Sequence, residues 1–300
     1  MHQFYRGAGL VIFSAVGFGF MPILALFAYR GEMNVPTLLF LRFALAALVF
    51  LLYLKKLGCK IKISRGRLVP LLILGGVLYP LQAAFYFSAV KYIPVSLAAL
   101  LLYTYPAFVA VISAAVDREK PAKQIIASIV LSFLGLFFVL GVSFAALNFF
   151  GALLALAAAV VYSCYFILGN RLVKDIPPLM VSALICFFAA PALLITGLLA
   201  GAVNFHFQPQ AWLPVGGLVL FSTVFAILAL LRGIALIGST KAAIFSIFEP
   251  LVTVLFSALI FAERLTLPQF LGGAAVLAGA FLIVAAQRQE NQEAEKTAVS

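Results

Sequence analysis

Long runs of apolar residues, separated by short polar segments, recur along the whole chain. A run of about 20 apolar residues is long enough to cross a bilayer as an α-helix. The pattern predicts ten such spans, at 8–28, 35–54, 68–90, 95–116, 123–142, 150–169, 178–200, 211–231, 240–261 and 268–286. β-Barrel strands are excluded, because they are about 10 residues long and alternate in polarity. The first run is full length and has no clear A-x-A-like site, so it is interpreted as a retained span rather than a cleaved signal peptide.

Composition agrees with this class. The chain is 65% hydrophobic and only 10% charged, whereas about 25% of the residues of a soluble protein are charged. The sequence therefore predicts an all-α polytopic membrane protein surrounded by the lipid bilayer, with no segment left for a folded soluble domain. The polar residues 288–300 are expected to form a disordered cytoplasmic tail.

The net charge of +11 is unevenly distributed between the two sides of the predicted spans. With the N-terminus inside, only Arg30, Lys91 and Arg264 fall in outer loops, and most other basic residues fall in inner loops and tails. This bias predicts that both termini are cytoplasmic in a multi-pass protein of the cell inner (cytoplasmic) membrane. The basic cluster 55–67 is interpreted as a topology determinant, with lipid-headgroup contact as the alternative. No nucleic-acid partner is expected.

An internal repeat appears when the chain is shifted by 144 residues. The coinciding pairs include Gly7 with Gly151, Pro70 with Pro214, Ile93 with Ile237, Pro106 with Pro250, Glu119 with Glu263 and Gly135 with Gly279. Each half holds five spans, so the second half enters the membrane from the opposite side. The sequence thus predicts two inverted five-helix repeats, 1–145 and 146–287, as in many secondary transporters. One chain suffices for a complete pathway, and an oligomer is compatible with it.

Several stretches resemble EamA-type members of the drug/metabolite transporter superfamily. They are LRFALAAL at 41–48, AVKYIPVSLAALLLYTYPAF at 89–108, LALAAAVVYSCYFILGNRL at 154–172, GIALIGSTKAAIFSIFEPLVTVLFSALIFAERLT at 233–266 and LGGAAVLAGAFLIV at 271–284. The "EP" and the following "E-R-L-T" are the most specific. The resemblance implies two five-helix repeats and transport of small organic solutes, often export of amino acids or other metabolites. The first span departs from the family, because VGFGFMPILALFA lacks the frequent Trp-Gly and later Lys, so no role is carried over for that pair.

One carboxylate, Glu249, lies in the middle of an apolar run, FSIFEPLVTVLF at 245–256, and the repeat places Tyr105 at the equivalent position. A charge at this depth is costly in hydrocarbon and usually faces the bundle interior or a water-filled cavity. Two interpretations remain open for Glu249. It is either a cavity carboxylate that binds an amino group or a proton, or a protonated acid that hydrogen-bonds a neighbouring helix.

Other candidate residues lie at a similar depth between the two halves. They are Phe18, Tyr79, Gln82, Tyr103, Tyr105, Tyr162 and Tyr165. Buried tyrosine hydroxyls need hydrogen-bond partners, and an aromatic wall suits amino acids and planar organic molecules, although dry helix packing is an equal alternative. Arg42 is expected about 10 Å below the outer end of its span. It could meet a substrate carboxylate, pair with a helix end or with Glu249, or snorkel to the outer interface.

The function favoured by these features is secondary transport of small organic metabolites, with export of amino acids or related compounds by alternating access. The alternative is proton-coupled efflux of lipophilic cations or drugs through Glu249. An enzyme is disfavoured, because His2 and His206 both lie outside the spans and the sequence contains neither H-E-x-x-H nor a Walker loop. The cysteines, Cys59, Cys164 and Cys186, have no paired spacing, so no disulfide, metal or other cofactor is expected.

Overall fold

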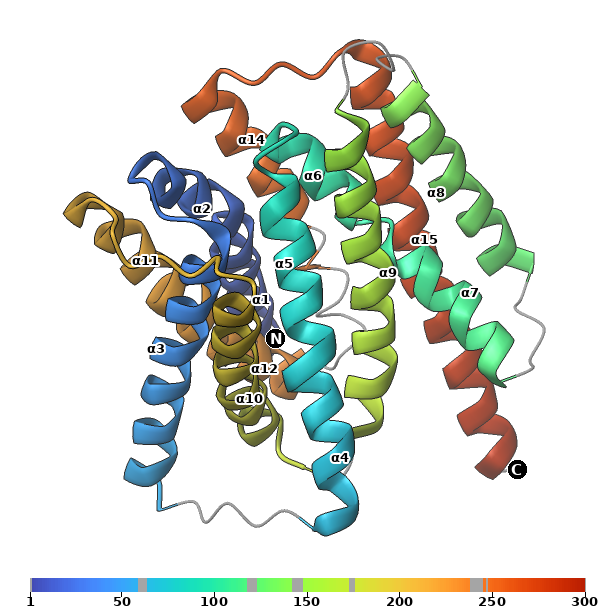
Figure 1. The fold of residues 1–300 in the computed structure, drawn as a ribbon. Helices are drawn as coiled ribbons and strands as arrows, with labels where there is room; N and C mark the ends of the chain where they lie inside the picture. The colour runs from blue at the N-terminus through green and yellow to red at the C-terminus, as the bar shows by residue number, and fades with distance from the viewer. Residues whose placement is uncertain are drawn as a thin grey trace.

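The computed structural model describes residues 2–58, 64–117, 123–141, 148–172, 176–237, 245–246 and 248–299, and these form helices and connecting loops without any β-strand (Figure 1). The first half contains α1 (His2–Gly19), α2 (Met21–Arg30), α3 (Val35–Lys56), α4 (Arg65–Ile73), the π-helical turn η1 (Leu74–Leu78), α5 (Tyr79–Ala89), α6 (Val95–Leu102), α7 (Tyr105–Asp117) and α8 (Lys123–Gly141). The second half contains α9 (Phe149–Leu172), α10 (Pro178–Leu199), the 3-10 turn η2 (Pro209–Ala211), α11 (Trp212–Val219), the π-helical turn η3 (Leu220–Phe225), α12 (Ala226–Ile237), α14 (Phe248–Phe261) and α15 (Leu267–Val299).

The helices match the apolar runs of the sequence. Six helical segments of the described chain are long and apolar enough to cross a membrane. They are Gln3–Arg30, Val35–Lys56, Gly66–Ala89, Val95–Ile112, Leu179–Leu199 and Pro209–Leu230. Shorter apolar helices occupy Ile126–Gly135, Phe149–Tyr165, Phe248–Phe261 and Leu267–Leu282. Each of the ten segments coincides with one predicted span, so the all-helical polytopic fold is confirmed.

The packing shows how the two halves are related. Gly7 of α1 packs on Ile237 of α12 without room for a Cβ atom, and Gly151 of α9 packs on Ile93 in the same way. The 144-residue shift turns the first contact into the second, because it pairs Gly7 with Gly151 and Ile93 with Ile237. Such reciprocal contacts are the mark of a two-fold relation. In the same way, the shift turns the packing of α1 on α12 into the packing of α9 on α5. In the packed pairs α3 with α10 and α8 with α15, each helix contacts its own equivalent in the other repeat.

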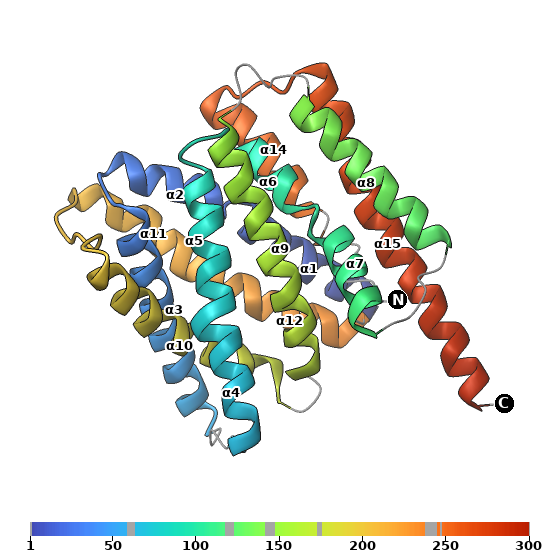
Figure 2. The ribbon, with the colours of Figure 1, turned by 45° about the vertical axis from the view of Figure 1, so that its right-hand side comes forward.

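Figure 1 and Figure 2 show α8 and α15 side by side at one edge of the molecule. The helix α15 continues through the polar residues 288–299, where the sequence predicts disorder. Adding turns to an existing helix avoids the costly nucleation step, so a polar extension can remain helical. In both views this extension carries the C-terminus away from the bundle.

Four of the spans are not continuous α-helices. Span 1 breaks at Phe20, between α1 and α2, and span 4 breaks at residues 103–104, between α6 and α7. Spans 3 and 8 are interrupted by the π-helical turns η1 and η3, which overlap when the chain is shifted by 144 residues. Single π-turns inside helices often mark functional sites. The apolar runs predict the ten spans but do not show where these interruptions lie.

Glu263 ties the loop before α15 to the first half of the chain. Its carboxylate accepts hydrogen bonds from the backbone N–H groups of Val95 and Ser96, at 2.9 and 3.1 Å, and from the Ser96 hydroxyl at 2.7 Å. These amides open α6 and have no partner within that helix, because the first N–H groups of a helix lack a preceding turn. Glu263 therefore caps a helix of the other repeat.

Glu263→Gln is expected to lower the free energy of unfolding by about 1–2 kcal/mol, because the amide offers one acceptor oxygen in place of two and removes a charge from a helix N-terminus. Thermal unfolding in detergent measures the loss. The matched control is Glu32→Gln, since Glu32 is an exposed carboxylate whose one side-chain hydrogen bond within the described residues comes from Gln208. Equal changes for the two variants would contradict the capping role.

Candidate functional site

The break in span 4 places Tyr105 at a helix N-terminus, and its equivalent Glu249 lies near the start of the described helix α14. Tyr105 is the first residue of α7 and Glu249 lies in the first turn of α14. The prolines that follow, Pro106 and Pro250, suit a first turn because proline lacks the N–H that would be unpaired there. A carboxylate at a helix N-terminus is stabilised by the free amides and by the helix dipole. Discontinuous helices of this kind build the binding sites of many secondary transporters.

Glu249 is half-buried and accepts a hydrogen bond from Tyr103 of the first repeat. The Tyr103 hydroxyl lies 2.9 Å from Glu249 Oε2 and 3.1 Å from the carbonyl oxygen of Ser246, so it can donate to either acceptor. The hydrogen bond to a neighbouring helix, which is one interpretation of the sequence, is therefore present. Because the tyrosine is the donor, the bond does not require the protonated acid.

Five tyrosines and one phenylalanine form a continuous chain of aromatic contacts that starts beside Glu249. In order, the rings are Tyr103, Tyr105, Tyr162, Tyr165, Tyr79 and Phe43. Neighbouring ring centroids are 4.8–5.7 Å apart, within the range of favourable aromatic pairs. The chain crosses between repeats, since Tyr162 and Tyr165 belong to α9 and the other rings belong to the first half. We name it the aromatic chain.

Arg42 stands at the opposite end of the aromatic chain. Its guanidinium lies 5.0 Å from the ring centroid of Phe43 and 5.3 Å from that of Phe87. The Nε atom donates to Thr223 Oγ1 at 3.1 Å. Arg42 is only 2% exposed, so the snorkelling interpretation is wrong. The aromatic faces and the Thr223 hydroxyl hold the side chain inside the bundle, and no carboxylate of the described residues pairs with it.

The 144-residue shift relates several of these positions to one another. Tyr79 is equivalent to Thr223. Thr223 accepts from Arg42, and Tyr79 packs on Phe43, the ring beside the Arg42 guanidinium. Phe18 is equivalent to Tyr162, and Tyr105 to Glu249. Residues that are equivalent in the two repeats can gather at one place only near the axis that relates the repeats. The tyrosines, Arg42 and Glu249 therefore lie where the two halves meet.

Two predicted residues stand apart from the aromatic chain. Gln82 is buried in α5, one turn after Tyr79. Phe18 is half-buried in α1 and makes no ring contact with the chain within the described residues, whereas Phe20 packs on Phe221 and Phe256.

Sequence reasoning missed several residues of the site. Phe43 and Phe87 enclose Arg42, and Ser246 shares the Tyr103 hydroxyl with Glu249. Apolar or small residues of this kind are common in every span, so no sequence signal distinguishes them. No group of three or more His, Cys, Asp or Glu side chains in the described part of the chain could hold a metal ion.

Gly19 brings α1 into direct contact with α14 beside Glu249. Thr253 Oγ1 donates to the Gly19 carbonyl oxygen at 2.9 Å. A Cβ atom on Gly19 would lie 2.8 Å from the carbonyl oxygen of Glu249 and 2.9 Å from Val252 Cγ1. These separations are shorter than van der Waals contact, so only glycine allows this approach.

Gly19→Ala is expected to destabilise the protein by about 1–3 kcal/mol and to slow transport, because the added methyl group must push α1 away from the backbone of α14. The control is Gly216→Ala in α11, where a Cβ atom would meet nothing within 4 Å. That change should be neutral or stabilising by up to about 1 kcal/mol, since alanine favours a helix over glycine. Thermal unfolding and proteoliposome transport test both variants, and an unaffected Gly19→Ala variant would contradict the contact.

Comparison with known proteins connects this architecture to a family. The model of the EamA-like transporter family matches residues 5–141 and again residues 149–285, so the two matches are offset by the same 144 residues as the internal repeat. An uncharacterized transporter of Bacillus subtilis, YcbK, is 30% identical over 195 residues, which are 62% of this chain and 62% of the relative. An uncharacterized transporter of Archaeoglobus fulgidus is 26% identical over 265 residues, which are 86% of this chain and 90% of the relative.

The fold is also shared with a solved protein. A crystal structure of a protein superposes with a TM-score of 0.65 over 94% of this chain and 98% of that chain, at 20% identity, which supports the fold alone. The family match, in contrast, covers both halves of the sequence. The chain therefore belongs to the EamA-like transporter family of the drug/metabolite transporter superfamily and is a membrane transporter.

Proposed function

We propose that this transporter exports amino acids or closely related zwitterionic metabolites. The observation that carries the proposal is the separation of two deep charges by one aromatic chain. Glu249 stands at one end and Arg42 at the other, and neither has a side-chain partner of opposite charge in the described part of the chain. A charge buried without a counter-ion is costly. A substrate with an ammonium and a carboxylate group would supply both missing partners.

The aromatic chain suits the body of such a substrate. Tyrosine rings offer an apolar face and a polar hydroxyl, so they can pack on a side chain and hydrogen-bond to its polar groups. The ammonium group would also be attracted to the faces of Tyr103 and Tyr105 near Glu249. The site then recognises the shared backbone groups of amino acids, and the rings accommodate different side chains.

Alternating access follows from the two-fold relation between the repeats. Contacts such as Gly7 with Ile237 and Gly151 with Ile93 exchange under the shift, so each half can take the conformation of the other. Exchange of the two conformations opens a central site first to one side and then to the other. We place both termini in the cytoplasm and the protein in the cell inner membrane, in accord with the positive-inside bias.

Proton-coupled efflux of lipophilic cations is the second candidate. Its support is the environment of Glu249, where a carboxylate lies among tyrosine rings that attract cations. The position of Arg42 opposes it, because a second buried cation in the same aromatic chain would repel such a substrate. The two candidates therefore predict different substrates.

A substrate panel in proteoliposomes distinguishes them. The panel contains an aromatic amino acid, its carboxamide, its deaminated acid and a lipophilic cation, each assayed with and without a pH gradient. We expect counterflow of the amino acid to exceed that of the carboxamide and of the acid. Transport of the lipophilic cation alone, and only with the gradient, would replace the proposal by the second candidate.

A further inference from the structure

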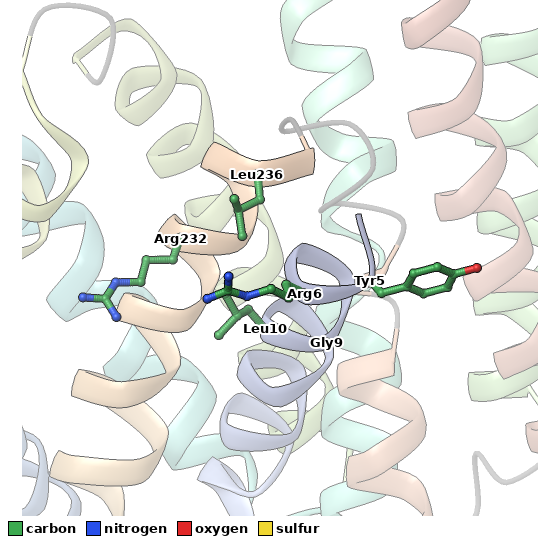
Figure 3. A pocket seen from close by; sticks show the side chains of 6 residues that line it. All are labelled: Tyr5, Arg6, Gly9, Leu10, Arg232 and Leu236. Atoms are coloured by element: carbon green, nitrogen blue, oxygen red, sulfur yellow. The ribbon is translucent and has the colours of Figure 1, made fainter. Parts of the chain in front are cut away.

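A cavity lies away from the aromatic chain, where α1 begins and α12 ends. Its volume is about 660 Å³ and it is open to the surroundings. The lining residues are Tyr5, Arg6, Gly9, Leu10, Arg232 and Leu236 (Figure 3). In Figure 3 the side chain of Arg6 reaches from α1 toward α12, Arg232 leaves α12 on the same side, and Tyr5 points the opposite way. Two cationic groups from different helices thus border one cavity.

Neither guanidinium is neutralised by a carboxylate within the described residues, and both side chains are exposed. The apolar part of the wall comes from Leu10 and Leu236, and Gly9 leaves the surface of α1 open between them. The spacing of the two helices is set by the close contact of Gly7 with Ile237 directly beside the cavity. The packing of α1 on α12 therefore forms the cavity. Its wall combines two guanidinium groups that have no carboxylate partner among the described residues with apolar side chains.

We propose that this cavity binds the headgroup of an anionic phospholipid. Guanidinium groups hold phosphate oxygens with paired, charge-assisted hydrogen bonds. Basic pockets between transmembrane helices are suited to anionic lipid headgroups. The cavity lies at the membrane boundary, because Arg6 precedes the long apolar run of span 1 and Leu236 follows the end of span 8. The lipid phosphate bridges Arg6 and Arg232, and an acyl chain follows Leu10 and Leu236.

The apolar wall favours a lipid over a soluble anion. Free phosphate would use the two arginines and leave the leucines exposed to water, whereas a lipid buries both parts of the cavity. In the proposed orientation the site faces the inner leaflet. The proposal does not depend on what the transporter carries, because the cavity is separate from Glu249 and Arg42.

Binding is measured on the purified full chain in detergent by titration with short-chain phosphatidylglycerol, with the unfolding temperature and native mass spectrometry as readouts. The double variant Arg6→Gln/Arg232→Gln should bind about thirtyfold more weakly, which is equivalent to about 2 kcal/mol for two basic residues. The matched control is Lys91→Gln/Lys123→Gln, which removes two exposed cations that lie outside this cavity and outside the basic cluster 55–67. This control should keep the wild-type affinity.

Gly9→Leu is a second test that retains both arginines and fills the apolar part of the cavity. It should weaken binding of the lipid but leave binding of inorganic phosphate unchanged, and it remains informative if the arginine variant fails to fold. Three results would overturn the proposal. They are equal losses in the arginine and lysine variants, full stabilisation of the wild type by inorganic phosphate alone, and unchanged lipid binding by Gly9→Leu and the arginine variant.

Discussion

Glu249→Gln is expected to reduce transport of amine-bearing substrates by about ten- to a hundredfold, while the protein still inserts and folds. A hydrogen bond to a charged group contributes about 1.5–3 kcal/mol, and glutamine cannot supply the charge. The amide can still accept from Tyr103, which donates to Glu249 in the structure. Replacing a deep carboxylate by a neutral group lowers the cost of burial, so the unfolding temperature should be unchanged or higher.

Counterflow in proteoliposomes at matched protein density measures this effect. Glu32→Gln neutralises an exposed outer carboxylate and should transport at the wild-type rate. Wild-type rates from Glu249→Gln would leave Glu249 only a structural role as a hydrogen-bond partner of Tyr103. A loss confined to conditions with a pH gradient would instead favour proton exchange through Glu249.

Arg42→Met is expected to remove the preference for an amino acid over its carboxamide. The guanidinium is buried against Phe43 and Phe87 and has no carboxylate partner in the described part of the protein. If a substrate carboxylate is that partner, removing the guanidinium should reduce the transport rate of the amino acid by about ten- to a hundredfold and leave that of the carboxamide unchanged. Methionine fills a similar volume, and replacement of a buried charged group by an apolar one is often tolerated, so the variant should fold.

Comparing the amino acid with its carboxamide shows whether Arg42 binds the substrate or supports the helix packing. Equal losses for the amino acid and its carboxamide would show that Arg42 supports the helix packing rather than a carboxylate. Thr223→Val is the control, because it removes the hydroxyl that accepts from Arg42 Nε and keeps the charge. We expect it to lower the rate by less than Arg42→Met and to retain the preference. Arg42→Lys should transport poorly, since lysine cannot reproduce the planar guanidinium.

The architecture could be predicted because it depends on the lengths of apolar runs and on the positions of a few residue types, and both can be read from the sequence. The length of an apolar run decides whether a segment can cross a bilayer. The prolines, glycines and glutamates at one constant offset revealed the repeat, and the odd number of spans in each half made it inverted. The reciprocal contacts of Gly7 and Gly151 agree with that inference. Glu249 was recognisable because a carboxylate is rare at that depth.

The arrangement of the site could be predicted only in part. Depth selected the tyrosines of the aromatic chain, but it also selected Phe18, which makes no ring contact with them within the described residues. Depth left Arg42 with several interpretations, and its enclosure by Phe43, Phe87 and Thr223 decided between snorkelling and burial.

The sequence by itself determined the membrane class, the spans, the inverted repeat and the presence of one deep carboxylate. The class, the spans and the deep carboxylate follow from apolar length and from the cost of a charge in lipid, and the repeat follows from residues that recur at one constant offset. Only the tertiary structure decided which side chains meet. It brought Tyr103 to Glu249, linked both repeats through Tyr162 and Tyr165, and placed two arginines in one cavity where α1 begins and α12 ends. The physical reason is that most of the surface of each membrane helix is apolar, so the pattern of polarity does not identify which helix packs against which, and close packing between helices does.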